Sequence, residues 1–248
     1  MEFDIMKISK LAWAGLAINI AVATVIVLYL SQDGLVESYE EELLDEFISI
    51  LLIIFAISIP MQGISLLLLS KAPKAGRVLA FISTVLMLPL SMIFFIGYLF
   101  SYEWRYNRGL TPFNADVPPP LDVSLGFNLK QFSLSGILCI VLGIVIGLIG
   151  INVGWLIVAV GVVALINSSR LENRIMIGLS QDKLIITPAL YAETFIIPIS
   201  DVTLIQDKPQ SFKLQIKSGG VDRTSTILKR KHQQEEFGKV IAKIATQK

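Results

Sequence analysis

Charged residues are scarce in this chain of 248 residues. Only 17% of the residues are charged, whereas 54% are apolar; ordinary soluble domains have about 25% charged residues. This balance excludes an intrinsically disordered chain and a nucleic-acid binder with a dominant basic charge, and it argues against a soluble enzyme. The mean hydropathy of +0.69 instead indicates a membrane protein.

Thiols, imidazoles and catalytic motifs are also scarce. Cys139 is the single cysteine, so no internal disulfide is possible, and its apolar surroundings indicate a packing residue. His232 is the single histidine and lies in a polar stretch with no cysteine nearby, so it predicts no metal site. HExxH, GxSxG, GxxxxGK[ST] and CxxC motifs are missing. We therefore expect no cofactor, no metal, no catalytic residue and no enzymatic activity.

Long uncharged runs dominate the first two thirds of the chain. A helix needs about 20 apolar residues to cross the hydrocarbon core of a membrane. The run from 134 to 166 is too long for one span, so we expect a reversal near Gly150, with one uninterrupted helix as the alternative. The sequence thus predicts an α-helical membrane bundle of about five spans, with four as the alternative. The expected spans cover residues 11–30, 47–70, 78–100, 134–150 and 152–168.

Glycines are concentrated in the last two of these spans. Small residues at helical spacing let two helices approach closely in a membrane. We expect these glycines to lie on the two faces along which the helices pack. They are Gly136, Gly143, Gly147, Gly150, Gly154 and Gly161.

The charge changes sign along the chain. Residues 1–168 hold eight basic and twelve acidic residues, whereas residues 169–248 hold thirteen basic and eight acidic residues. Hydrophobicity changes at the same place, which predicts a membrane domain over 1–168 and a separate basic domain over 169–248. Segment 101–133 lies between the third and fourth expected spans, and we expect it to be a connector. In an alternative interpretation, residues 123–132 lie along the membrane surface.

Short β-type runs replace the long apolar runs after residue 174. They are rich in Ile, Val, Leu, Phe and Thr and are separated by turn residues. The apolar positions of the final segment, 233–246, instead follow a helical period. The sequence predicts a small α+β domain of antiparallel strands closed by one helix. The runs cover residues 174–179, 183–187, 194–198, 202–206, 212–217 and 224–228.

Three features give this domain a family resemblance. The strand Leu184-Ile185-Ile186 after a polar turn, the segment from Ile197 to Val202, and the terminal amphipathic helix resemble the bacterial pleckstrin-homology-like domain. The resemblance covers about residues 170–246. It implies a bent antiparallel sheet plugged by the helix, a cytoplasmic location beside a membrane hairpin, and a role in binding or assembly. It carries over no catalytic residue.

Sidedness depends on the number of spans. Segment 31–46 has seven acids and no base, whereas segment 71–77 has three bases. The positive-inside rule therefore places the first outside and the second inside. Four spans put both termini and 71–77 inside, which fits the charges best. Five spans leave a difference of one base and decide nothing. We expect a bacterial inner membrane and a cytoplasmic C-terminal domain.

Lys229, Arg230 and Lys231 form the sharpest basic cluster, where anionic lipid headgroups would bind. A solvated turn is the alternative. The expected partners are the lipid bilayer, anionic headgroups, and other membrane proteins or a second copy, but no nucleic acid. The leading hypothesis is a membrane protein with a module for assembly or scaffolding. The alternative is a transporter or channel subunit in which Pro60, Gln62 and the glycine faces line a pathway.

Overall fold

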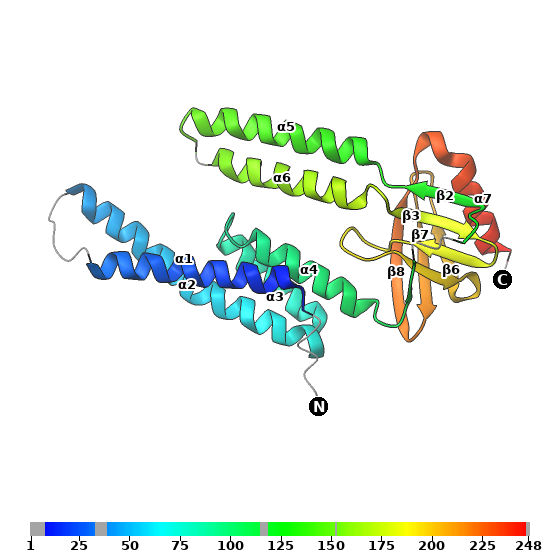
Figure 1. Ribbon diagram of the computed structural model, residues 1–248, viewed down its shortest axis with the longest axis horizontal. Coiled ribbons are helices and arrows are strands. Elements are labelled where there is room, and N and C mark those ends of the chain that lie inside the picture. The colour runs from blue at the N-terminus through cyan, green and yellow to red at the C-terminus, as the bar shows by residue number, and fades with distance from the viewer. Residues whose placement is uncertain (1–7, 33–38, 115–118, 152, 247–248) are drawn as a thin grey trace. The chain divides into compact units, whose positions relative to one another are not determined.

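The computed structural model describes residues 8–32, 39–114, 119–151 and 153–246, although the side chains of residues 29–48 and of His232 are not described. It divides into two compact units, Met1–Arg105 and Tyr106–Lys248. Among the described residues, the first unit is helical, and the second combines two long helices with strands and a short terminal helix (Figure 1). The change of composition at residue 169 therefore falls inside the second unit.

The first unit contains two long helices and a shorter helical hairpin. The long helices are α1 (Lys10–Gln32) and α2 (Tyr39–Lys71), and the hairpin is α3 (Pro73–Leu86) and α4 (Met92–Tyr106). Residues 87–91 form a turn in which the Leu88–Pro89 peptide is cis. In Figure 1, α3 leaves the end of α2, and α4 returns alongside α1.

The predicted span over 78–100 is wrong. This stretch divides into helices of 14 and 15 residues that run in opposite directions. Pro89 has no backbone N–H and disfavours the interior of a helix, so the apolar run breaks there. Hydropathy does not reveal this break, because a membrane-embedded stretch is equally apolar whether the chain reverses within it or continues through it.

Within the described residues, four helices are long and apolar enough to cross a membrane. These stretches are Lys10–Leu28, Ser49–Lys71, Leu129–Leu148 and Val153–Leu171. The last two belong to α5 (Leu129–Leu148) and α6 (Val153–Leu171), so the predicted reversal is confirmed and the single long helix is excluded. Gly150 lies at this reversal with φ +86°, a left-handed conformation that favours glycine.

The strands of the second unit form two antiparallel sheets. The first sheet has the order β1-β5-β4-β3-β2, and the second has the order β6-β7-β8. The final helix, α7 (Gln234–Ala245), follows them. The strands are β1 (Thr111–Pro112), β2 (Val123–Gly126), β3 (Ile175–Ser180), β4 (Lys183–Ile186), β5 (Phe195–Pro198), β6 (Val202–Asp207), β7 (Ser211–Ser218) and β8 (Val221–Leu228).

Every predicted strand after residue 174 is present within one to three residues of its expected bounds, and so is the final helix. The segment before α5 is different from its prediction. Instead of a connector or a surface-lying stretch, it supplies β1, which pairs with β5, and β2, which pairs with β3. The α5–α6 hairpin is thus inserted between two neighbouring strands of one sheet.

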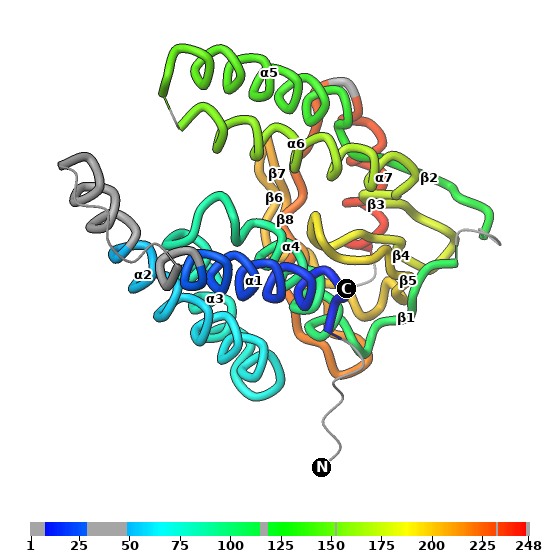
Figure 2. Tube along the Cα trace, turned by 60° about the vertical axis from the view of Figure 1, so that its left-hand side comes forward, coloured from blue at the N-terminus to red at the C-terminus, as the bar shows by residue number. Residues whose placement is uncertain are grey.

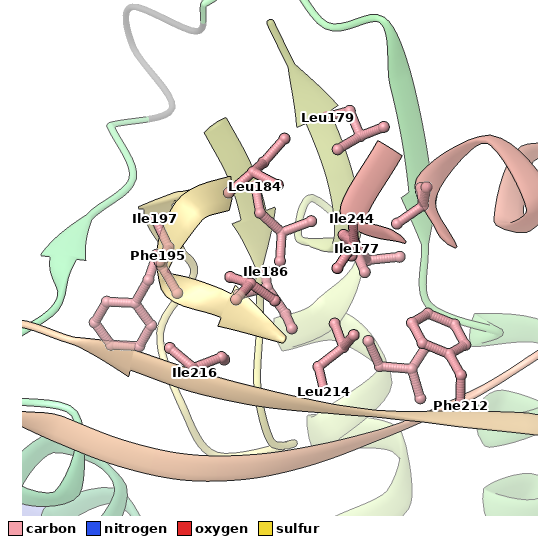
Figure 3. Packing of buried hydrophobic residues seen from close by; sticks show 14 of the residues in the cluster. Ile177, Leu179, Leu184, Ile186, Phe195, Ile197, Phe212, Leu214, Ile216 and Ile244 are labelled. Carbon is pink, nitrogen blue, oxygen red and sulfur yellow. The ribbon is translucent and has the colours of Figure 1, made fainter. Parts of the chain in front are cut away.

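The core of the second unit lies between the two sheets and α7 (Figure 3). In β7, Phe212, Leu214 and Ile216 are buried, and the residues between them are not, which is the alternation expected of a half-buried strand. From α7, Phe237 and Ile244 reach the same core. Burial of one such side chain is worth roughly 1.5–3 kcal/mol before entropic costs.

Candidate functional site: a buried polar cluster

Three polar side chains meet where the turn of the α3–α4 hairpin reaches α1 and α2. Asn19 lies near the middle of the apolar stretch of α1, and Gln62 lies near the middle of that of α2. Ser91 comes from the turn before α4. All three residues are fully buried by other protein atoms.

Hydrogen bonds join these side chains into one cluster. The Asn19 Nδ2 donates to Gln62 Oε1 at 2.8 Å and to Ser91 Oγ at 3.0 Å. The Gln62 Nε2 donates to Ser91 Oγ at 2.9 Å and approaches the Met87 sulfur at 3.7 Å. The cluster therefore ties the hairpin turn to both long helices, because each helix supplies one amide that bonds Ser91.

Close contact between α1 and α4 sets the position of the turn. A Cβ on Gly97 would lie 2.1 Å from the Ala12 nitrogen, and a Cβ on Gly15 would lie 2.3 Å from the Phe94 nitrogen. The two backbones are thus in close contact at these two positions, where α1 passes α4 in Figure 2. Only glycine permits this approach, so both glycines hold the turn at the depth of Asn19.

The cluster has two oxygens without a partner. In the described part of the chain, neither Asn19 Oδ1 nor Ser58 Oγ meets a hydrogen-bonding group, although both are buried. Ser58 lies one helical turn before Gln62, on the same face of α2. By contrast, Ser65, one turn beyond Gln62, donates to the Gln62 carbonyl oxygen at 2.7 Å.

The residues that a transport pathway was expected to use have different surroundings in the structure. Gln62 is buried, but Pro60 is exposed on the outside of the first unit. Among the six glycines, a Cβ on Gly143 would lie 2.6 Å from the Gly154 oxygen, and a Cβ on Gly161 would lie 2.6 Å from the Gly136 oxygen. These four glycines lie where α5 and α6 contact each other.

The remaining two glycines have different surroundings. A Cβ on Gly147 would meet the ring of Trp155 at 3.1 Å, whereas one on Gly150 in the turn would meet nothing within 4 Å. A hydrogen bond of 2.7 Å between the hydroxyls of Ser133 and Ser168 extends the α5–α6 contact towards the sheets. Five of the six glycines therefore lie where the two helices pack.

The basic cluster after β8 is largely engaged in the fold. Lys229 forms an ion pair with Asp207, and Arg230 donates to the carbonyl oxygen of Gly126 at 2.6 Å. Partial burial lowers the pKa of Arg230 from its ordinary value. Lys231 is exposed. Arg230 therefore fastens the end of β2, just before α5, and Lys231 is the base left open to solvent.

Arg223, a buried arginine in the second unit, was not identified from the sequence. Arg223 on β8 is buried, donates to Asn107 Oδ1 at 2.8 Å and to the Pro188 carbonyl oxygen at 3.3 Å, and lies 5.2 Å from the Tyr106 ring centroid. It joins the start of the unit to the sheets. Alternation in β8 marks position 223 as inward-facing, which is the signal that would have found it.

Metal-binding groups and thiols add little to the site. No group of three or more His, Cys, Asp or Glu side chains that could hold a metal occurs in the residues that the structure describes. Cys139 is a free thiol, half-buried on α5.

Comparisons with protein-family models, with curated proteins and with solved structures find no match for this chain.

Proposed function

We propose that the protein is an integral membrane protein with four spans, one re-entrant hairpin and a cytoplasmic docking domain. The surface of α3 supports membrane embedding. Its exposed residues include Val78, Phe81 and Val85, whereas Ser83 and Thr84 are buried. A helix in water has the opposite arrangement, and apolar residues face outward when the solvent is lipid.

The hairpin α3–α4 enters and leaves the membrane on one side in this proposal. The Arg105 Nη2 donates to the Ser70 carbonyl oxygen at 3.2 Å, so the ends of α4 and α2 meet. Arg77 near the start of α3 lies 5.3 Å from the Tyr102 ring centroid near the end of α4. Broken backbone at membrane depth is tolerated when protein surrounds it, as it does at Ser91.

Four spans give one consistent distribution of charge. In the first unit the bases lie at the start of α1, the end of α2, the start of α3 and the end of α4. In the α5–α6 hairpin they lie at the ends next to β2 and β3. We propose that segments 31–46 and 149–152, which contain no base, face the opposite side of the membrane. The positive-inside rule then assigns both termini and the sheets to the cytoplasm. The bases are Lys10, Lys71, Lys74, Arg77, Arg105, Lys130, Arg170 and Arg174.

Cysteine accessibility in intact cells tests this arrangement. In a Cys139→Ala background, a cysteine placed between residues 33 and 38 should react with a membrane-impermeant maleimide. Cysteines at Lys74 and Lys213 should react only after the membrane is opened. A cysteine at Leu90, in the hairpin turn, should react from neither side. If Leu90→Cys and Lys74→Cys label from opposite sides, the hairpin crosses the membrane and the four-span proposal fails.

The docking role rests on how the sheets are joined to the hairpin. Because β2 precedes α5 and β3 follows α6, pairing of these strands fixes the domain at both ends of the hairpin. Two antiparallel sheets closed by α7 support the pleckstrin-homology-like resemblance. We infer that the domain is an assembly platform held at the membrane surface. Its partner is another membrane protein or a second copy.

The outer face of the second sheet is the surface to test. Ile205 and Leu228 are exposed there, and Lys213 and Thr226 face each other across β7 and β8. A photoreactive residue at Thr226 should give a crosslinked product of defined mass in cell membranes. The same residue at Glu235 on α7 is the matched exposed control. Equal products from both positions, or none from Thr226, would contradict docking through this face.

A second candidate function is a transporter or channel subunit. The observation that favours it is the buried polar cluster at the tip of a broken helical hairpin, since half-helices and unwound backbone commonly build such sites. Solute flux in proteoliposomes that the double variant Asn19→Leu/Gln62→Leu abolishes would support this function. Unchanged flux in that variant would exclude the cluster from it.

A further inference from the structure

In the buried cluster around Gln62 every amide N–H group has a partner, whereas one amide oxygen does not. Each primary amide offers two N–H groups. Those of Asn19 go to Gln62 and Ser91, and those of Gln62 go to Ser91 and the Met87 sulfur. Ser91 Oγ accepts two of these bonds, so its own O–H remains to donate.

The polar groups of the cluster that have no partner are complementary to one kind of ligand. Asn19 Oδ1 requires a donor, and the hydroxyl of Ser58 has no partner in the described part of the chain. The hydroxyl of Ser91 requires an acceptor. A buried polar atom without a partner costs considerable free energy in an apolar interior. A molecule that both donates and accepts would satisfy these groups together.

The ligand must also be neutral. Segments 11–32 and 47–70, which supply Asn19, Ser58 and Gln62, contain no Asp, Glu, Lys or Arg. A cation bound to these oxygens would have no counter-charge within these segments, and an unpaired ion is far more costly to bury than a neutral dipole. This charge argument separates the cluster from a sodium or proton site.

We propose that Asn19, Ser58 and Ser91 form a binding site for one small neutral molecule that donates a hydrogen bond to Asn19 Oδ1. Water is the smallest molecule with this chemistry, and a neutral polar solute such as urea or glycerol offers the same groups. A buried water typically makes about three hydrogen bonds, which matches the three open groups. The inference does not depend on the docking role of the second unit.

Magnetic-resonance transfer from water to the side-chain amides tests the proposal directly. The full chain, with ¹⁵N-labelled Asn and Gln, is placed in lipid bilayers, and magnetisation transfer from water to the amides of Asn19 and Gln62 is measured. We expect rapid transfer although both residues lie within apolar stretches. A second sample with ¹³C-urea and ¹³C-glycerol shows whether solute carbons contact the same amides.

Two serines of α2 provide a matched pair of variants. Ser58 and Ser65 are both fully buried and flank Gln62, but only Ser65 has a hydrogen-bond partner. Ser58→Ala should slow the transfer about threefold or more, whereas Ser65→Ala should leave it unchanged. Magnetisation transfer retained between the amides of Asn19 and Gln62 shows that the cluster itself is intact in each variant.

Each outcome decides the proposal. Water transfer that Ser58→Ala slows identifies water as the occupant, and solute contacts that replace it identify a neutral solute. If the wild-type chain shows neither water transfer nor solute contacts, the site is dry and the proposal is overturned. If Ser58→Ala and Ser65→Ala have the same effect, Ser58 does not line a binding site. The wild-type result is decisive even if a variant fails to fold.

Discussion

The contact between α5 and α6 leads to a quantitative prediction at Gly161. An added Cβ would lie 2.6 Å from the Gly136 oxygen and 2.9 Å from the Ile140 nitrogen. Both atoms belong to the backbone, so neither can rotate away. Carbon atoms pack against their neighbours at about 3.5–4.0 Å, so Gly161→Ala must separate the helices by roughly 1 Å.

That separation has an estimable cost. A radial gap of about 0.5–1 Å removes roughly a quarter to a half of the attraction between facing atoms. Overpacking in proteins typically costs about 1–3 kcal/mol, which we expect for Gly161→Ala. Gly147→Ala should cost less, because its nearest neighbour is the movable Trp155 ring at 3.1 Å. Gly63→Ala should cost nothing, since a Cβ there meets nothing within 4 Å and alanine is the better helix former.

A cysteine pair reports the packing of the two helices. The hydroxyls of Ser133 and Ser168 lie 2.7 Å apart, so the double cysteine variant should form a disulfide rapidly in bilayers when Cys139 is replaced by alanine. Gly161→Ala should slow disulfide formation and lower the stability in a reversible unfolding assay. Glycine packing would be refuted if Gly161→Ala matched Gly63→Ala in both measurements.

Three further predictions concern the second unit. Arg230→Met should lower its stability by about 1 kcal/mol by removing a backbone-directed hydrogen bond. Lys231→Gln should leave its melting temperature unchanged while reducing the retention of anionic lipid by the purified full chain. Arg223→Lys should cost about 2 kcal/mol in chemical unfolding, because an ammonium cannot reproduce the forked guanidinium contacts; full retention of stability would contradict this role. The hydrogen bond and charge of Lys239 lower the pKa of Glu235 from its ordinary value of 4.5. This contribution is present above the ordinary pKa and is lost as the pH falls through the lowered value, so Glu235→Gln should flatten the acid limb of the stability profile.

The sequence could predict the features that local patterning controls. Apolar length is sufficient to identify α1, α2, α5 and α6, because each of them exceeds the thickness of a membrane core. Short β-branched runs between turn residues are likewise sufficient for β3–β8. Both signals reside within the segment itself, so no distant contact is needed to interpret them.

The sequence indicates only two of the three residues of the polar cluster. Asn19 and Gln62 stand out as polar residues in apolar runs, but Ser91 does not, since a single serine in an apolar stretch is common within a helix. Their meeting depends on Gly15 and Gly97, which let α4 lie directly on α1. No spacing rule relates residues 19, 62 and 91, because they come together only across three separate elements.

The scarcity of charge and the alternation of apolar residues indicated, by themselves, a bundle of apolar helices of membrane length, with five expected and four as the alternative, and a strand-rich basic end. Tertiary structure alone decided that the stretch 78–100 reverses at Pro89 instead of continuing. It also decided that β1 and β2 belong to the same sheet as β3, although β2 precedes β3 by more than 40 residues. The physical reason is that hydropathy records which solvent a residue prefers, whereas chain direction and strand pairing depend on partners that are distant in the sequence.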